Sequence, residues 1–188
     1  MRKLAILLTL TPVAAQAAEP ACLTPAEFTA LSTYALPNMI AGAATRCATV
    51  LPKDAWLPAN GAQLAGRYAE GKARAWPAAK AAFLKLGAGQ GPDAARMLRT
   101  MPDPSLQMIA DGFIQGLVGQ QLPASRCSTV DRVVRLLSPL PAESTAELIA
   151  ITVGLSARTG GGKVGDLRLC PAVEAPANPA PANNRTRK

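Results

Sequence analysis

Apolar residues recur at helical spacing through most of the chain, most regularly between positions 103 and 118. Seven of them fall at i, i+3, i+4, i+7, i+8, i+11 and i+12: Leu106, Ile109, Ala110, Phe113, Ile114, Leu117 and Val118. This spacing places them on one side of an α-helix. Asp103 as cap and Pro104 at the first helical position mark its start. We therefore predict a helix here with this whole apolar side in the core.

The segment after Cys22 shows a strong helix start. Thr24 and Glu27 form a capping box, with Pro25 at the first helical position, which predicts a helix over 25–36. Pro37 is expected to open a second helix that ends at Cys47, because proline is tolerated in the first turn of a helix and not in its interior. These two helices would fold back on each other as a hairpin.

The middle of the chain predicts three further helices. A connector over 52–58 is followed by a helix over 61–86, capped by Asn60 and kinked or restarted at Pro77. Three glycines between 87 and 91 end it, and a short helix is expected over 93–100. A helix beginning at 128–131 turns four apolar side chains inward: Val130, Val133, Val134 and Leu137. The arginines at 132 and 135 point outward.

The segment 146–155 is the most apolar part of the chain after the leader. Ile149, Ile151 and Val153 favour a strand by propensity. Glu143 and Glu147 stand where the first turn of a helix prefers carboxylates, and no partner strand is evident elsewhere. We predict a helix, with a buried strand as the alternative.

The two ends of the sequence differ from its middle. Arg2 and Lys3 precede a short apolar run that ends in Ala-Gln-Ala at 15–17, which is typical of a signal peptide cleaved after Ala17. The run is too short for a membrane anchor. The last segment, 171–188, is rich in proline, alanine and asparagine and ends in basic residues, so a disordered tail is expected.

Removing both ends leaves 153 residues, 18–170, enough for one domain with a hydrophobic core. The whole sequence has a formal charge of +8, but this middle part holds 15 basic and 11 acidic residues, a net charge of +4. The balance does not predict nucleic acid as a partner, and the mature chain contains no expected transmembrane span. The predicted fold is all-α, a compact bundle of helical hairpins stapled by disulfides.

Four cysteines, Cys22, Cys47, Cys127 and Cys170, make an even set in an exported chain, which predicts two structural disulfides and a periplasmic or secreted location. If the helices over 25–36 and 37–47 form a hairpin, Cys22 and Cys47 lie at the same end of it. We therefore favour Cys22 paired with Cys47 and Cys127 paired with Cys170. The nested pairing, Cys22 with Cys170 and Cys47 with Cys127, is the main alternative.

The sequence contains no histidine. This removes the most common general base, the most common metal ligand and the imidazole of nucleophilic triads. The acidic residues are scattered singly, so they show no pair of the kind that hydrolyses glycosides. Asp111 lies one position off the apolar stripe of its helix and is expected at the rim of the core. We predict no cofactor, no metal site and no catalytic residue, and we favour a protein that is not an enzyme.

Basic residues dominate positions 67–99. If residues 61–86 form one helix, Arg67, Arg74 and Lys85 fall on nearly the same side of it and make a candidate interaction stripe. With nearby aromatic side chains, this stripe could contact an anionic surface or an acidic protein. A solvated helix face is the simpler explanation.

These observations lead to one favoured function and two alternatives. We expect an exported helical protein without enzymatic activity that binds another envelope component, either an envelope protein or an anionic surface. The first alternative is an envelope enzyme that uses carboxylate chemistry. The second is a membrane-surface protein that acts through the basic stripe. Two carboxylates converging in a pocket would favour the enzyme, and a large exposed apolar patch would favour the binding protein.

Overall fold

The computed structural model describes residues 22–159, 163–164 and 167–170. Its elements are α1 (Pro25–Cys47), α2 (Trp56–Ala69), α3 (Lys72–Ala88), α4 (Pro92–Thr100), α5 (Asp103–Gln121), a short 3₁₀-helix (Ala124–Arg126), α6 (Cys127–Leu137), α7 (Ala142–Thr159), β1 (Lys163–Val164) and β2 (Leu167–Arg168). The predicted fold class, an all-α bundle stapled by disulfides, is confirmed. The predicted leader, 1–17 with cleavage after Ala17, and the predicted tail, 171–188, lie outside the described residues.

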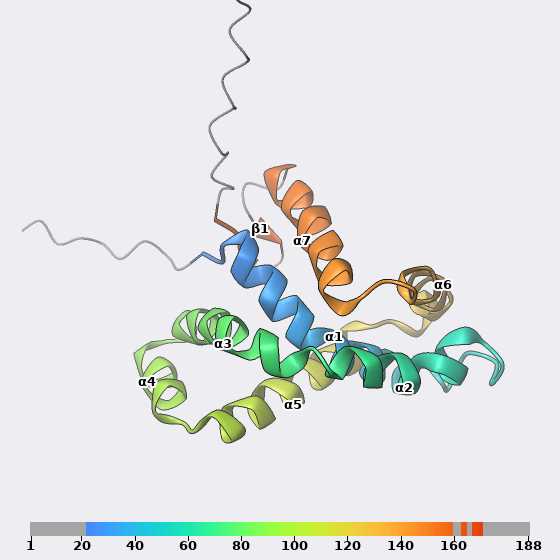
Figure 1. The fold of residues 1–188 in the computed structure, drawn as a ribbon, viewed down its shortest axis with the longest axis horizontal. Helices are drawn as coiled ribbons and strands as arrows, with labels where there is room; N and C mark the ends of the chain where they lie inside the picture. Colours follow the sequence, from blue (N-terminus) through green and yellow to red (C-terminus); the bar gives the residue numbers. More distant parts are fainter. Residues whose placement is uncertain (1–21, 160–162, 165–166, 171–188) are drawn as a thin grey trace, which may run out of the picture.

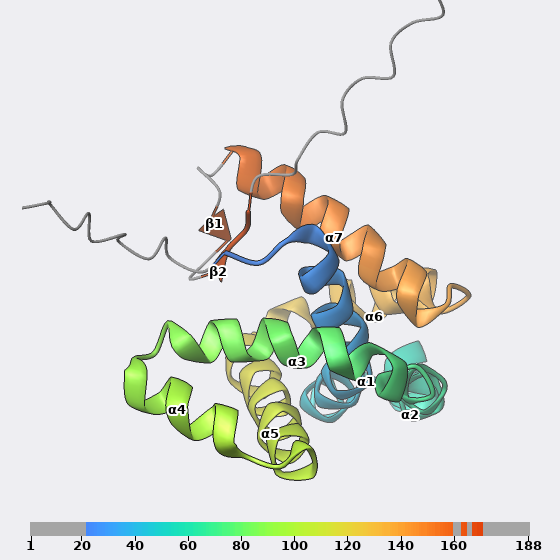
Figure 2. The same ribbon diagram turned by 60° about the vertical axis from the view of Figure 1, so that its left-hand side comes forward.

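Helix α1 is the centre of the fold. It packs against α2, α3, α5 and α7, whereas α4 packs mainly on α3 and α6 mainly on α2. In Figure 2, α7 lies on one side of α1, and α3 and α5 lie on the other. In Figure 1, α2 lies beside the carboxyl-terminal half of α1 and α3 follows it along the same side. One long helix thus serves as the scaffold on which the others are placed.

The prediction that Pro37 separates two helices is wrong. Helix α1 runs without interruption for 23 residues with Pro37 inside it. A proline in a helix interior costs about 3 kcal/mol, because one backbone hydrogen bond is lost and the ring crowds the preceding turn. The neighbouring side chains Tyr34, Leu36 and Ile40 are all buried. Burial of such side chains contributes about 1.5–3 kcal/mol each, which outweighs the cost of the proline.

The helix predicted over 61–86 is interrupted, but not at Pro77. The break lies at Glu70 and Gly71, and Pro77 stands inside α3. The connector predicted over 52–58 is shorter than expected, since α2 begins at Trp56. The start of α2 has no capping side chain of its own. Instead, the backbone amide of Leu57 donates to the Asp131 carboxylate of α6 at 2.6 Å, so the cap comes from a distant part of the chain.

The apolar side of α5 is only half covered, in contrast to the prediction that all of it is core. Leu106 and Ala110 are buried. Phe113, however, is 60% exposed, and Ile109 and Leu117 are also exposed. The stripe is wider than the strip of α5 that α1 can cover, because one neighbouring helix buries only a narrow line of side chains on its partner.

The favoured disulfide pairing is wrong, and the nested alternative is the one observed. Cys22 is bonded to Cys170, and Cys47 is bonded to Cys127, with Cα atoms 5.0 and 5.4 Å apart. The reason is the continuity of α1. A 23-residue helix is about 35 Å long, so cysteines at its two ends are far beyond the roughly 7 Å that a disulfide can span.

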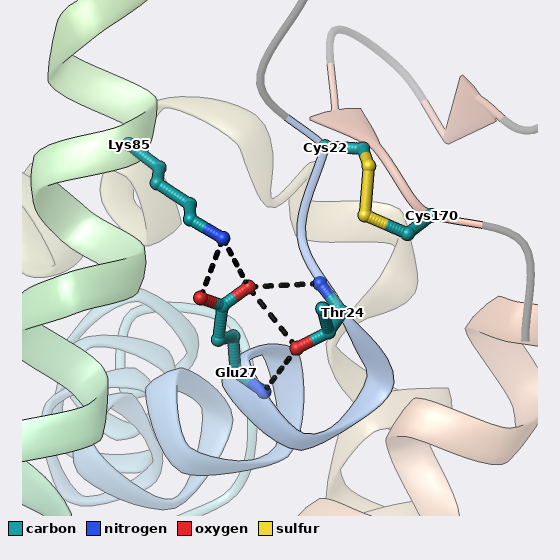
Figure 3. The surroundings of a disulfide bond; sticks show 5 residues. All are labelled: Cys22, Thr24, Glu27, Lys85 and Cys170. Atoms are coloured by element: carbon teal, nitrogen blue, oxygen red, sulfur yellow. Dashed lines mark hydrogen bonds and ion pairs between the residues drawn. A yellow bond between two sulfur atoms is a disulfide. The ribbon is translucent and has the colours of Figure 1, made fainter. Parts of the chain in front are cut away.

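The carboxyl-terminal part of the domain returns to the start of α1. The segment 146–155 is helical, as predicted, and not a strand; it lies within α7, which runs from Ala142 to Thr159. After it, β1 and β2 pair antiparallel, and Leu23 forms a parallel bridge with Leu169. Figure 3 shows how the disulfide of Cys22 and Cys170 fastens this junction. Within the described ranges, no helix is both long and apolar enough to span a membrane.

Candidate functional site

The three residues of the predicted basic stripe do not share one helix side. Arg67 lies near the end of α2 and Arg74 near the start of α3, with the helix break between them. Each side chain also has a partner. Arg67 donates to the Ser138 carbonyl at 2.8 Å, and Arg74 pairs with Glu143 at 3.2 Å. The prediction that these three residues lie on one side of a single helix is therefore wrong.

Lys85, the third member of the stripe, supports the start of α1. Its ammonium lies 2.6 and 2.8 Å from the two carboxylate oxygens of Glu27, which also accepts from the amide and the hydroxyl of Thr24 (Figure 3). The Lys85 ammonium, and then the Thr24 amide, hold the pKa of Glu27 below its usual value. This lysine is part of a capping network at the domain junction.

The carboxylates are used one at a time to join helices. Asp103 binds the Trp76 indole and the Lys80 ammonium, and these two interactions, the lysine first, lower its pKa. Asp111 lies at the rim of the core, as predicted, where the Lys72 ammonium contacts both of its oxygens at 2.8 Å. A general acid requires a raised carboxyl pKa, and the shifts of Glu27 and Asp103 are downward. Among the described ion pairs, no basic side chain brings two carboxylates together.

The described residues contain no cluster of three or more acidic, cysteine or histidine side chains that could hold a metal ion. Both disulfides lie within this part of the chain and use all four cysteines. The charged and polar side chains thus connect helices to one another, and the candidate site lies on an apolar surface.

An apolar groove of about 390 Å³ opens beside the second half of α1. Helix α1 lines it with Leu36, Met39, Ile40 and Ala43. Helix α6 lines it with the four residues predicted to face inward: Val130, Val133, Val134 and Leu137. Those α6 side chains do turn toward the protein, but they face a groove rather than a closed core, and Val133 remains exposed. The size and the apolar lining fit a small-molecule binding site.

The remaining walls come from three other helices. Helix α2 contributes Leu64 and Tyr68, and α7 contributes Thr145 and Ile149; α5 and the residue after it contribute Val118, Gln121 and Leu122. The polar atoms at the base of the groove are engaged with each other. The Tyr68 hydroxyl lies 3.0 Å from Thr145 Oγ1, 3.0 Å from the Leu140 carbonyl and 3.3 Å from the Leu137 carbonyl.

Helix α6, which forms one wall of the groove, is held at three points. Its first residue, Cys127, is bonded to the last residue of α1, Cys47. Asp131 caps α2, and the Tyr68 hydroxyl reaches the carbonyl of Leu137 at the other end of α6. The α6 wall of the groove is therefore fixed before binding, which keeps the ordering cost of binding low.

Exposed apolar side chains continue the groove along two helices. On α5, Phe113 and Leu117 precede Gln121, a residue of the groove rim, at four-residue spacing and so lie on the same helix side. On α7, Leu148 and Leu155 are exposed beside the side that carries Thr145. An exposed apolar area of this kind marks a binding surface more often than scattered single residues do.

Uncompensated positive charge gathers around α6. Arg126, Arg132 and Arg135 are exposed on α6 or just before it, and within the described ranges none has an acidic partner. Arg46 donates to the carbonyl of Leu122, and Arg67 donates to that of Ser138. Both acceptors are neutral, so both guanidinium groups keep their charge. Of the predicted stripe, Lys85 is neutralised by Glu27 and Arg74 by Glu143, whereas Arg67 has only a neutral partner.

Sequence reasoning identified the four α6 side chains and Arg67 but did not predict the groove. The signal that could have indicated it is the excess width of the α5 stripe, since a wide apolar side needs more cover than one neighbouring helix provides. The charge around α6 was overlooked because its arginines are spread between positions 46 and 135.

We compared the chain with protein-family models, with curated proteins and with solved structures, and none of the three comparisons found a match.

Proposed function

We propose that this chain is an exported binding protein without enzymatic activity, which binds an apolar part of another cell-envelope component in the groove beside α1. The observation that carries the proposal is the groove itself: about 390 Å³, lined almost entirely by aliphatic side chains and open to solvent. Its continuation along the exposed sides of α5 and α7 supports the same conclusion.

Export is part of this proposal. The basic start, the short apolar run and the Ala-Gln-Ala site are typical of a signal peptide. The two disulfides are compatible with an oxidising compartment such as the periplasm or the medium outside the cell. An exported protein meets envelope components directly.

An enzyme that uses carboxylate chemistry is the less favoured function, because Glu27, Asp103, Asp111 and Glu143 are paired with lysine or arginine and Asp131 accepts the Leu57 amide. The membrane-surface function is also less favoured in its original form, because the stripe residues Arg67, Arg74 and Lys85 are engaged within the protein. Neither alternative explains the groove.

The proposal is tested by titrating the purified protein with N-phenyl-1-naphthylamine, an uncharged dye that fluoresces in apolar surroundings. We expect saturable binding of one dye per chain. Met39→Asp places a charge in the groove, at a side chain that is already 41% exposed, and is expected to weaken dye binding at least tenfold. Val133→Asp, on the opposite wall, is expected to act in the same way.

Met108→Asp is the matched control, because Met108 is 75% exposed on α5 and does not line the groove. It should bind the dye as the unmodified protein does. Circular dichroism checks that all three variants remain folded. The proposal fails if the dye does not bind saturably, or if Met108→Asp weakens binding as much as Met39→Asp does.

A further inference from the structure

We infer that two copies of this chain associate through the outward side of α7, with the two helices antiparallel about a two-fold axis. That side carries an apolar stripe of three residues, Leu148, Ile151 and Leu155, which are 44%, 54% and 58% exposed. The inference concerns a different surface from the groove and goes beyond the proposed function. It follows from the place of the stripe on α7, from its spacing and from the charges beside it.

The stripe lies on the side of α7 that faces away from the rest of the domain. Helix α7 packs mainly on α1, and Figure 2 shows it at the edge of the molecule. Its buried side is marked by Ala146 and Ala157, which are 0% and 3% exposed. At about 100° per residue, every residue of the stripe lies about 120–180° around the helix from both alanines. The fold of one chain therefore leaves this side of α7 open.

The spacing of the stripe is that of a seam between two helices. Its three residues follow one another at i, i+3 and i+7, which are successive a, d and a positions of a heptad. A single exposed leucine is ordinary on a protein surface. Three aliphatic side chains in line on the outer side of one helix form a surface that pairing with another helix would remove from water.

Two charged residues beside the stripe identify its partner. Glu147 and Arg158 are both exposed, and neither takes part in an ion pair among the described residues. They are about 20° apart around the helix, so they lie on the same flank of the stripe, one near each end of it. The opposite flank carries Thr152 and has no charge.

This charge pattern is complementary to itself in one orientation. In a parallel two-fold pair, opposite flanks meet, so the charged flank of each copy would face the uncharged flank that carries Thr152. In an antiparallel pair, the same flank of each copy meets. Glu147 then lies opposite Arg158 of the second copy, and the symmetry forms this ion pair twice. A second copy of this chain therefore fits the surface in shape, in apolar character and in charge.

The apolar stripe and the ion pairs have different roles in this contact. Exposed ion pairs add little affinity, so burial of the stripe supplies most of it. The ion pairs set the orientation, because any other arrangement leaves them unpaired or places like charges together.

The first experiment measures the mass of the purified mature protein by sedimentation over a series of concentrations, with both disulfides intact. We expect the average mass to rise toward that of a dimer as the concentration increases. Ile151→Asp should weaken association about tenfold or more, because it places an unpaired charge in the contact. Met97→Asp is the matched control: Met97 is 57% exposed on α4, outside the stripe, and its replacement should leave association unchanged.

The second experiment tests the orientation by exchanging charges. Glu147→Arg alone and Arg158→Glu alone each place like charges opposite one another, so each should weaken self-association about tenfold at low salt. A mixture of these two variants restores opposite charges across the contact and should associate as the unmodified protein does. The double variant, which exchanges the two charges within one chain, should do the same. A role of either residue inside its own chain could not be rescued by mixing.

Several results would overturn the inference. These are a monomer at every concentration, equal weakening by Met97→Asp and Ile151→Asp, and charge variants that mixing does not rescue. A monomer that sediments with vesicles of phosphatidylethanolamine and phosphatidylglycerol, and loses this binding in Ile151→Asp, would assign the stripe to a membrane surface instead. Binding of the dye in the groove should be unchanged in Ile151→Asp, because Ile151 does not line the groove. Failure of this inference therefore remains distinguishable from failure of the proposed function.

Discussion

Replacing a tyrosine by phenylalanine removes only its hydroxyl oxygen and so tests the hydrogen bonds at the base of the groove. The chain has two tyrosines, and their hydroxyl groups differ in hydrogen bonding. The Tyr68 hydroxyl joins α2 to the turn between α6 and α7 through Thr145 and two carbonyls. The Tyr34 hydroxyl is buried in the second half of the core and has no hydrogen-bond partner among the described residues. Tyr68→Phe and Tyr34→Phe are therefore matched substitutions with opposite expected effects.

The magnitudes follow from these contacts. Tyr68→Phe leaves the Thr145 hydroxyl without this partner at a buried site, so the free energy of unfolding should fall by about 1–3 kcal/mol. Tyr34→Phe removes a hydroxyl that lost its water on folding and has no partner within hydrogen-bond distance, although the Asp111 carboxylate lies nearby. We expect the free energy of unfolding to stay the same or to rise by up to about 2 kcal/mol.

The assay is equilibrium unfolding in urea, followed by tryptophan fluorescence and by circular dichroism, with the disulfides intact. If the free energy of unfolding falls with urea concentration at the same slope in all three proteins, the variants change stability and not the surface exposed on unfolding. The reasoning is refuted if Tyr34→Phe destabilises the protein as much as Tyr68→Phe does, because the Tyr34 hydroxyl would then have a stabilising partner.

Titration of the same variants adds a second check. Burial raises the pKa of the Tyr34 hydroxyl well above its usual value of 10.0, and the nearby Asp111 carboxylate acts in the same direction. Tyrosine in the unfolded chain still ionises near pH 10. Stability that is present below this pH is therefore lost as the pH rises above it. In Tyr68→Phe, where Tyr34 is the remaining tyrosine, phenolate absorbance should appear only as the protein unfolds.

Three further predictions concern stability. Replacing Cys47 and Cys127 by alanine opens a loop with a sequence separation of 80 and should lower the free energy of unfolding by about 4.5 kcal/mol in urea. The pKa of Glu27 is lowered, so the stability that its carboxylate contributes is present above about pH 4.5 and lost as the pH falls below it. In Glu27→Gln, the free energy of unfolding measured at a series of pH values should therefore fall less steeply with acid. Gly66→Ala, with open space around it, should raise the melting temperature by the equivalent of about 0.5–1 kcal/mol. Gly61→Ala should gain less, because its new methyl group meets a side-chain carbon of α1 at 3.1 Å.

Each of these has a result that would contradict it. An unchanged urea midpoint after loss of the inner disulfide would mean that the crosslink does not restrict the unfolded chain. Acid unfolding that is the same with and without the Glu27 carboxylate would show that the capping network contributes nothing. Equal gains at the two glycine positions would remove the argument that α1 and α2 approach each other closely at Gly61.

The helices that could be predicted from sequence are those whose signals are local. The capping box of Thr24 and Glu27 forms within four residues, and it is present in the structure as predicted. Pro37 misled the prediction because its local cost is overcome by the burial of side chains around it. That burial depends on helices far along the chain, which local patterns do not reveal.

The candidate site could be predicted only in part, for a similar reason. The apolar side of α6 was evident from its spacing, but whether it faces a filled core or an open groove depends on how closely α1, α5 and α7 approach it. The charges show the same limit. Lys85 is neutralised by Glu27, 58 residues away, while Arg46 donates to Leu122 before the start of α6 and Arg67 donates to Ser138 after its end.

The bond between Cys22 and Cys170 has a mechanical consequence. A pull applied to chain segments outside these two residues would pass through the sulfur–sulfur bond, so the 147 residues between the cysteines would bear almost none of the load. Stretching single molecules from their two ends should therefore extend only the segments outside the crosslink. After reduction, the helices themselves should carry the force and unravel, which would add the length of the whole domain.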